Sequence, residues 1–419
     1  MSYWLFGVAA LFVLYSLVSR RLSTTAVTGP MVFVTAGLIL GSDALGVLDV
    51  EPSSDLVTLL LEVTLAVVLF TDATKINASN WRAEAFVPGR LLTWGLPLTV
   101  IFGAVAAAVM FTSLSIWEAA LIGAILAPTD AALGQAVVTN PRVPQRIRQA
   151  LNVESGLNDG IALPLVLVFL AAAEETAQGG GSLGGLLSFL GQEILVAAAI
   201  GIVFGWLGAK AVIHANNRQW VSRTWLQIGA LALAVAAYGL AVPLGGSGFI
   251  AAWLTGLTLG AATRGKVDDL SEFAESLGSV LTMASFFVFG AILLGPALGN
   301  LTWQVAVYAI LTLAVLRGGA VAISMIGSNL RSATVLFMGW FGPRGLASII
   351  FAGLIVEDAV LPGSNLIVTI TMVTVGLSIY AHGATSWFGS ESYGRWYQRQ
   401  QKGEQPADRP TGNNKPEPG

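Results

Sequence analysis

The sequence predicts an all-α polytopic membrane protein with 13 transmembrane helices. Three observations predict this fold class. Only 11% of the 419 residues are charged, 55% are hydrophobic, and the mean hydropathy is +0.74. Soluble domains carry about 25% charged residues, so a chain this long and this poor in charge is expected to lie in a bilayer. The apolar residues also fall into windows of span length, and the basic residues gather in alternate loops between these windows.

Each predicted span rests on a run of about 20 mostly apolar residues. The first, "YWLFGVAALFVLYSLVS", lacks a preceding basic region and a small-residue cleavage signal, so it is interpreted as a span and not as a signal peptide. The seventh is longer than a span needs and is expected to tilt or to contain an irregular stretch. The windows cover residues 3–19, 25–46, 56–73, 91–111, 116–138, 150–173, 183–213, 224–243, 246–263, 279–298, 302–327, 333–356 and 364–386.

The charged residues of the loops predict the orientation. One set of alternate loops, together with the C-terminal tail, carries all but two of the 21 Lys and Arg residues. The opposite loops carry acids, namely Asp49, Glu51, Asp55, Glu174, Glu175, Glu357 and Asp358. By the positive-inside rule the basic side is cytoplasmic, which places the N-terminus outside and the C-terminus inside the cell (inner) membrane. A wrong number of spans would scramble this segregation.

Composition excludes several classes of site and partner. There is no cysteine for a disulfide or a thiolate metal site, and two histidines cannot build a His-rich metal site, so no cofactor is expected. The basic loops are the ordinary orientation signal and imply no nucleic-acid partner. Residues 387–419 are polar and end in "GEQPADRPTGNNKPEPG", which predicts a disordered cytoplasmic tail. A membrane sensor or scaffold is disfavoured because no soluble output domain is evident.

Charged residues lie where the bilayer should be most apolar. These are Asp130, Glu154, Asp159, Arg317 and Arg344 near the middle depth, with Glu62 in the outer part of the third span and Asp72 at its inner end. A charge at mid-bilayer costs from about 3 to over 10 kcal/mol, so each is expected to face a partner or a water-filled cavity. One interpretation is a set of buried ion pairs that lock helices together. Three mid-depth acids face two bases, however, so at least one carboxylate must be protonated or bound to a cation.

Two spans are interrupted at the same depth. "LAPTDAA" breaks the fifth span and "GWFGPRG" breaks the twelfth, because proline removes a backbone donor and clashes with the preceding turn. The two spans are seven apart and therefore antiparallel, which predicts inverted repeats of spans one to six and eight to thirteen, with a site at the midplane where the breaks meet. Asp130 is suited to balance amide-rich helix ends there, and Arg344 carbonyl-rich ones. The alternative is two ordinary proline kinks.

The sixth span carries "ESGLNDG" at its cytoplasmic half. Ser155 and Asp159 are four residues apart and share one helix face, while Glu154 and Asn158 share the adjacent face. Carboxylate, hydroxyl and carbonyl oxygens are the ligands that hard cations prefer. We therefore expect Ser155 and Asp159 to hold an ion, and Glu154 and Asn158 to turn toward neighbouring helices. Pro164 permits a bend above this site.

The strings "APTDAA", "ESGLNDG" and "FGPRGLAS", in this order on spans five, six and twelve, resemble the monovalent cation:proton antiporter-1 family, which includes the NhaP-type antiporters and the sodium/proton exchangers. The resemblance covers about residues 1–386. It implies an NhaA-like antiporter fold and a homodimer. It also implies core helices at about 91–173 and 302–386 and dimerisation helices at about 3–73 and 183–298.

The resemblance further implies roles for single residues. Asp159 would bind either the cation or the proton, and Asn158 would occupy the place where electrogenic relatives carry a second aspartate. Glu154 and Arg317 would form an ion pair that supports Asn158 and the core, and Arg344 would sit at the crossed unwound segments. Thr129, Asp130 and Ser155 would contribute to a sodium site. Many members carry a glutamate near "LFTDAT", where Asp72 is the available substitute.

Together these observations predict electroneutral exchange of one sodium ion for one proton by alternating access, with Asp159 binding each in turn. Because one site serves both ligands, a high proton concentration is expected to inhibit cation uptake. Potassium or broad monovalent selectivity, with lithium also possible, is the alternative within this class, since spacing does not fix cavity size. A passive cation channel is the alternative of another class. No enzymatic activity is expected.

Overall fold

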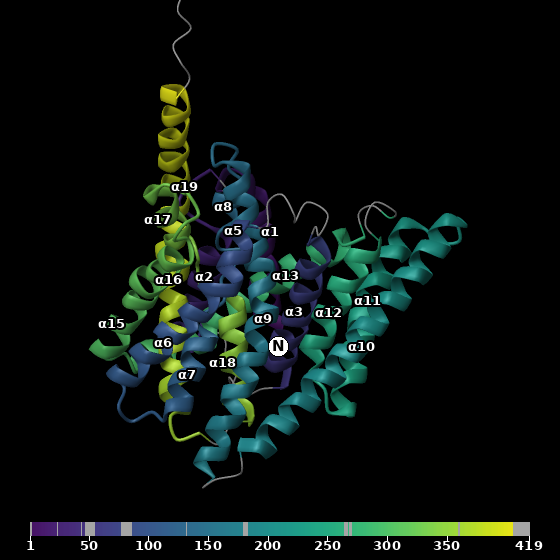
Figure 1. Cartoon of the computed structure of the whole chain (residues 1–419), viewed down its shortest axis with the longest axis horizontal. Helices are drawn as coiled ribbons and strands as arrows, with labels where there is room; N and C mark the ends of the chain where they lie inside the picture. Colours follow the sequence, from purple (N-terminus) through teal and green to yellow (C-terminus); the bar gives the residue numbers. More distant parts are fainter. Residues whose placement is uncertain are drawn as a thin grey trace, which may run out of the picture.

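The computed structural model describes residues 2–22, 24–42, 44–46, 55–76, 86–130, 132–178, 183–263, 267, 270–358 and 361–404 (Figure 1). The secondary structure of these residues is helical, which confirms the all-α prediction. The predicted loop charges Asp49, Glu51, Arg82, Arg264, Lys266, Arg409 and Lys415 lie outside the described residues.

Each of the 13 predicted windows contains helix. Among the described residues, 8 helices are long and apolar enough to cross a membrane, and the shorter apolar helices are Gly29–Leu40, Ile116–Ile125 and Gly248–Thr263. The chain is thus a multi-pass membrane protein, and the number of 13 crossings stays a prediction.

In chain order the first helices are α1 (Ser2–Leu22), α2 (Gly29–Leu40), α3 (Asp55–Lys75), α5 (Phe86–Arg90), η1 (Leu91–Gly95), α6 (Leu96–Met110), α7 (Ile116–Ile125), α8 (Gln135–Val138), α9 (Gln145–Ala177), α10 (Leu183–Asn217) and α11 (Arg223–Ala241). They are followed by η2 (Val242–Leu244), α12 (Gly248–Thr263), α13 (Glu272–Val288), η3 (Phe289–Leu294), α14 (Gly295–Gly299), α15 (Trp303–Leu311), η4 (Thr312–Leu316), α16 (Arg317–Ser324), α17 (Ser332–Trp340), α18 (Leu346–Asp358) and α19 (Ser364–Glu404).

Both predicted helix interruptions are present. α7 ends at Ile125, ahead of Pro128, and α17 ends at Trp340, ahead of Pro343. The two non-helical segments meet, because the backbone N–H of Asp130 donates to the carbonyl of Pro343 over 2.8 Å. The breaks are therefore one crossed unit and not two separate kinks. The inverted repeat that the spacing predicts stays a prediction.

In the part of the chain that the structure describes, three π-helical stretches interrupt the spans at positions where the sequence predicts no break. They are η1, η3 and η4. Pro97 follows η1 and Pro296 follows η3 at the start of the next α-helical segment. Proline donates no hydrogen bond and pushes away the carbonyl of the preceding turn, so that turn widens. No proline follows η4, which ends at Leu316 and is followed directly by Arg317, the first residue of α16.

The prediction of a disordered tail from residue 387 is wrong over its first part. α19 is one continuous helix of 41 residues that ends at Glu404, and in Figure 1 it runs past the rest of the bundle. The ring of Tyr393 stacks on Phe337 of α17 at 4.1 Å between centroids, and Glu391 pairs with Arg142. The aromatic residues among the polar ones give this segment a face that packs, so it stays helical. Residues 405–419 lie outside the described residues.

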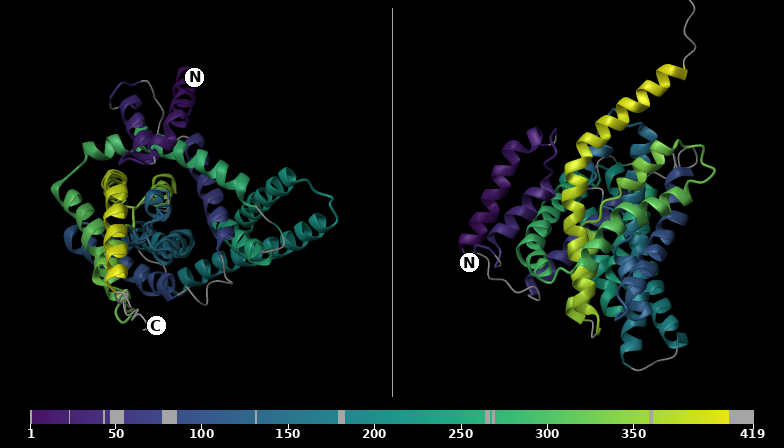
Figure 2. Two further views of the ribbon diagram at one scale, coloured as in Figure 1. Left: turned by 90° about the horizontal axis from the view of Figure 1, so that it is seen from above. Right: turned by 90° about the vertical axis from the view of Figure 1, so that its left-hand side faces the viewer.

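Two groups of helices frame the centre of the molecule. α12 packs on α3 so closely that the carbonyls of Phe70 and Thr74 occupy the space that a Cβ at Gly256 and Gly260 would need. α12 also packs on α10 and α11, and α13 packs on α3. Seen from above, α10 and α11 project to one side, away from α19 (Figure 2). On the other side α7 packs against α6 and α9, and α18 against α19. The interface between α3, α13 and α9 contains the cavity described next.

Candidate functional site

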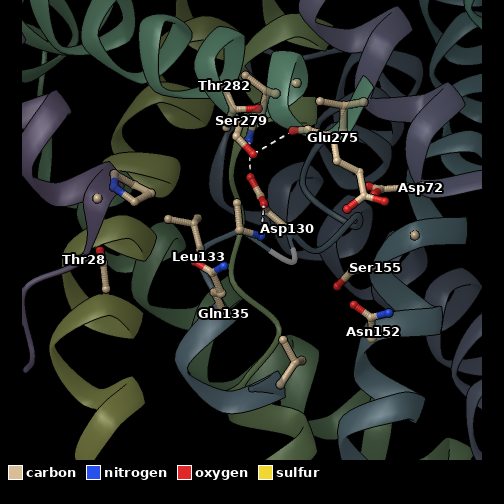
Figure 3. A pocket seen from close by; sticks show the side chains of 18 of the residues that line it. Thr28, Asp72, Asp130, Leu133, Gln135, Asn152, Ser155, Glu275, Ser279 and Thr282 are labelled. Atoms are coloured by element: carbon tan, nitrogen blue, oxygen red, sulfur yellow. Dashed lines mark hydrogen bonds between the residues drawn. The ribbon is translucent and has the colours of Figure 1, made fainter. Parts of the chain in front are cut away.

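A cavity of about 850 Å³ lies between α3 and α13 on one side and α9 with the α7–α8 break on the other. Its wall carries four acidic side chains, Asp72, Asp130, Asp159 and Glu275, and the ammonium of Lys75. Figure 3 shows Asp72, Asp130, Ser155 and Glu275 around this space. The cavity also reaches Leu22 and Lys75, at the ends of α1 and α3 where the basic loops lie. The structure thus brings residues from several distant regions of the sequence to one cavity.

Hydroxyl and amide groups form a network at the base of the cavity. Thr129 Oγ1 lies 3.0 Å from Ser155 Oγ, and Asn158 Nδ2 donates to Thr129 Oγ1 over 2.7 Å. Ser155 and Asp159 line the cavity, while Thr129 and Asn158 lie behind its wall, almost fully buried. Asn158 therefore orients the hydroxyl of Thr129, and that hydroxyl orients Ser155.

Asp159 is the acid of this site whose charge is least satisfied by the protein. It is 9% exposed, and its Oδ1 is buried with no hydrogen-bond partner among the described residues. A buried carboxylate oxygen without a donor is costly, so it favours a ligand that neutralises it. A proton and a monovalent cation both meet that requirement. The neighbouring hydroxyl of Ser155, one turn away on the cavity side, adds an oxygen suited to a cation.

Asp130 is committed to the backbone of the crossed breaks. Its Oδ1 accepts from the N–H of Ala132 over 2.7 Å, and its Oδ2 accepts from the N–H of Leu346 over 2.9 Å. Leu346 is the first residue of α18, so the carboxylate caps the amide-rich end of that helix. The sequence predicts this role, in which the negative charge of Asp130 balances the partial positive charge of an amide-rich helix end. Its contribution as a cation ligand stays a prediction.

Arg344 serves the opposite kind of helix end. It is fully buried, and its Nη1 donates to the carbonyls of Pro128, over 3.3 Å, and Gly342, over 3.1 Å. Its backbone N–H donates to Ser378 Oγ of α19 over 2.6 Å. The guanidinium thus lies where the α7 and α17 breaks leave carbonyls without helical partners. Arg344 does not line the cavity, and its hydrogen bonds support the crossing of the two breaks.

Glu154 and Arg317 form a bidentate ion pair behind the site. Arg317 Nη1 lies 2.5 Å from Glu154 Oε1, and Nη2 donates to Oε2 over 2.8 Å. Both residues are 1% exposed. The pair joins α9 to α16, and neither residue lines the cavity. Asn158 bonds to Thr129, and its predicted support by this pair is therefore indirect.

The sequence did not single out two residues at the mouth of the cavity. In the sequence Lys75 indicates only the orientation of a loop, and Glu275 precedes the tenth predicted window. Lys75 Nζ lies 3.8 Å from Asp72 Oδ1 and 3.5 Å from Glu275 Oε2. Glu275, Ser279 and Thr282 recur at helical spacing and all line the cavity, a pattern that would have revealed this polar face of α13. Glu62, the other acid singled out on α3, does not line the cavity.

The capping role of Asp130 gives a first test. In Asp130→Asn an amide group faces two backbone donors, so one buried N–H loses its acceptor, and unfolding is expected to become easier by about 1–3 kcal/mol. Thermal unfolding of the purified protein in detergent measures this loss. A variant as stable as the parent, with only cation affinity reduced, would show that the carboxylate serves the ion and not the helix end.

The chain matches the family model described as sodium/hydrogen exchanger, transmembrane, over residues 7–388. It is 28% identical over 388 residues to the K(+)/H(+) antiporter NhaP2 of Shewanella sp. strain MR-4, which covers 92% of this chain and 66% of that protein. It is 25% identical over 371 residues to the K(+)/H(+) antiporter NhaP of Alkalimonas amylolytica, covering 88% of this chain and 62% of that protein. The chain thus matches about two thirds of the length of these relatives.

The fold is similar to that of a solved structure. The sodium proton antiporter MjNhaP1 from Methanocaldococcus jannaschii superposes with a TM-score of 0.75 at 20% identity, covering 90% of this chain and 97% of that one. A more distant match is the Na(+)/H(+) antiporter 2 of Zygosaccharomyces rouxii, 26% identical over 247 residues, or 55% of this chain and 30% of that protein. The relatives' names thus include both potassium and sodium.

Proposed function

The chain belongs to the sodium/hydrogen exchanger family of monovalent cation:proton antiporters, and from that premise we propose that it exchanges a monovalent cation for a proton by alternating access. Asp159 is the shared carboxylate, occupied by either ligand in turn. One observation carries this proposal: a buried Asp159 oxygen has no donor among the described residues and belongs to a cavity-lining side chain. Exchange follows because the two ligands compete for one position.

The cation site we propose consists of Asp159 and the hydroxyls of Ser155 and Thr129, with Asp130 at its edge. Asn158 fixes Thr129 from behind, and the Glu154–Arg317 pair and Arg344 hold the surrounding helices. Asp72 reaches the same cavity from α3. A small set of oxygens around one carboxylate suits a hard monovalent cation.

The proposed stoichiometry is one cation for one proton. Asn158, next to Asp159, brings no second titratable charge to the site. A single carboxylate neutralised by either ligand moves through the membrane without net charge in both halves of the cycle. Exchange of this kind is insensitive to the membrane potential.

Sodium is the cation we propose, and potassium is the second candidate. The similar fold of a sodium proton antiporter supports sodium, whereas the names of the relatives from Shewanella and Alkalimonas favour potassium. Selectivity among alkali ions depends on cavity size and ligand number, which the oxygen inventory leaves open.

The proposed architecture explains how one site reaches both sides. Helices at about 91–173 and 302–386 form the moving core, and those at about 3–73 and 183–298 form the dimerisation part of a homodimer. The cavity lies where α9 and the α7–α8 break face α3 and α13, which supports motion along that boundary. With the N-terminus outside and the C-terminus cytoplasmic, the cavity opens to the cytoplasm.

Everted vesicles with an internal pH dye test the proposal. Sodium, lithium and potassium added in turn are expected to dissipate a preformed proton gradient, sodium at the lowest concentration. In proteoliposomes, the rate of exchange is expected to be the same when the membrane potential is clamped at zero and when it is clamped at a non-zero value. Cation flux that proceeds without proton movement would instead indicate a passive channel and would refute antiport.

A further inference from the structure

We propose that the ammonium group of Lys75, held at the mouth of the cavity, lowers the apparent affinity for the transported ion. Glu275 opposes this decrease in affinity by drawing Lys75 away from Asp72. The inference rests on the proposed function and deepens it. It assigns to two residues outside the Asp159 site a role in tuning that site.

The geometry places one ammonium between two carboxylates from different helices. Lys75 ends α3, three residues after Asp72, and its Nζ lies 3.8 Å from Asp72 Oδ1. On its other side Glu275 Oε2 of α13 lies at 3.5 Å. The second oxygen of Glu275, Oε1, accepts from the hydroxyl of Ser271, which fixes the carboxylate against Lys75. Lys75 is thus shared by Asp72 and Glu275.

Asp72 connects this cluster to the ion site. Its Cβ lies 3.6 Å from the position that a Cβ on Gly156 of α9 would take, between Ser155 and Asp159 in sequence. Asp72, Ser155, Asp159, Lys75 and Glu275 all line the same cavity. Lys75 and Glu275 are 41% and 42% exposed and Asp159 is 9% exposed, which places the pair nearer the solvent. Figure 3 shows Asp72, Ser155 and Glu275 around this space. A cation that enters from this mouth passes the Lys75 charge before it reaches Asp159.

The sign of the effect follows from Coulomb's law. The positive charge of Lys75 repels an entering cation and neutralises Asp72, so it weakens cation binding at the inner carboxylates. The negative charge of Glu275 does the reverse, because it screens Lys75 and attracts the cation. Lys75 and Glu275 are 41% and 42% exposed, so solvent reduces both effects. Exposed charge pairs of this kind change equilibria by about two- to fivefold.

The two single variants should therefore act in opposite directions. Lys75→Gln is expected to lower the KM for sodium about two- to fivefold, and Glu275→Gln to raise it by a similar factor, with the maximal rate little changed. The double variant should fall near Lys75→Gln, because Glu275 acts largely through Lys75. Raising the ionic strength with choline chloride should shrink the differences, since exposed charges are screened.

Arg223→Gln and Glu272→Gln are matched controls. This exposed ion pair, 2.7 Å between Arg223 Nη2 and Glu272 Oε2, also joins α13 to a neighbouring helix, but neither residue lines the cavity. Both controls should leave the KM for sodium unchanged. If the Lys75–Glu275 pair only held α3 against α13, both single variants would change stability or maximal rate in the same direction. This outcome would overturn the inference. An unchanged KM in both variants would overturn it as well. Absence of exchange in the parent protein would refute the proposed function, a separate result.

Discussion

Replacing Asp159 by asparagine is expected to abolish cation-dependent proton movement. The amide keeps the size of the side chain but removes the charge that a sodium ion needs and the oxygen that a proton needs. The site would then be neutral with no ligand bound, so neither ion would drive its conversion between the two sides. We expect proton efflux on sodium addition to fall to the level of vesicles without the protein.

Stability and a matched variant make this result interpretable. Asp159 Oδ1 has no hydrogen-bond partner among the described residues, so the asparagine should fold at least as well as the parent. Glu118→Gln is the control, because Glu118 is also a buried acid, 3% exposed, but it serves the start of α7 by accepting from Ser115 and Gly363. That variant should retain exchange per folded molecule. Exchange that persists in Asp159→Asn would disprove the assignment of the shared site.

The sequence predicted the crossed breaks well because proline and charge act locally. Pro128 and Pro343 each remove a backbone donor and disfavour a continuous helix, and a mid-depth Asp130 or Arg344 needs an opposite partial charge. The structure provides it within the crossing, through Leu346 N–H for Asp130 and the Pro128 carbonyl for Arg344. The pairing of Glu154 with Arg317 was implied by the family resemblance, and it is present in the structure.

Other features depend on contacts that one segment does not reveal. The outer half of α19 has a polar composition and stays helical because Tyr393 packs on Phe337 and Glu391 reaches Arg142, more than 200 positions away in the sequence. From the sequence, Lys75 looks like any lysine at the end of a span. Its pairing with Glu275 arises only when α3 packs on α13, which the sequence of either helix does not reveal. The π-helical turn before Arg317 is not followed by a proline, so the sequence gives no local signal that predicts it.

Breaking the Glu154–Arg317 pair is expected to cause the largest loss of stability. Both partners are 1% exposed, so Arg317→Met or Glu154→Gln leaves an uncompensated charge inside the bundle. Removing one member of a buried ion pair costs about 3–5 kcal/mol. Each single variant should therefore unfold at a clearly lower temperature in detergent, and the fraction of monodisperse protein on gel filtration should fall.

The double variant separates the pair from its surroundings. Glu154→Gln with Arg317→Met removes both charges, and replacing a whole buried pair is often close to neutral, so much of the lost stability should return. The double-mutant cycle then measures the coupling between the two residues. The exposed Arg223–Glu272 pair, 65% and 61% exposed, is the reference and should show coupling of about 0–1 kcal/mol. Additive losses at Glu154 and Arg317 would mean that each residue acts through other neighbours.

The pair also connects α9, which carries Asp159, to α16. Recovered stability without recovered exchange in the double variant would therefore show that the charges also position the ion site.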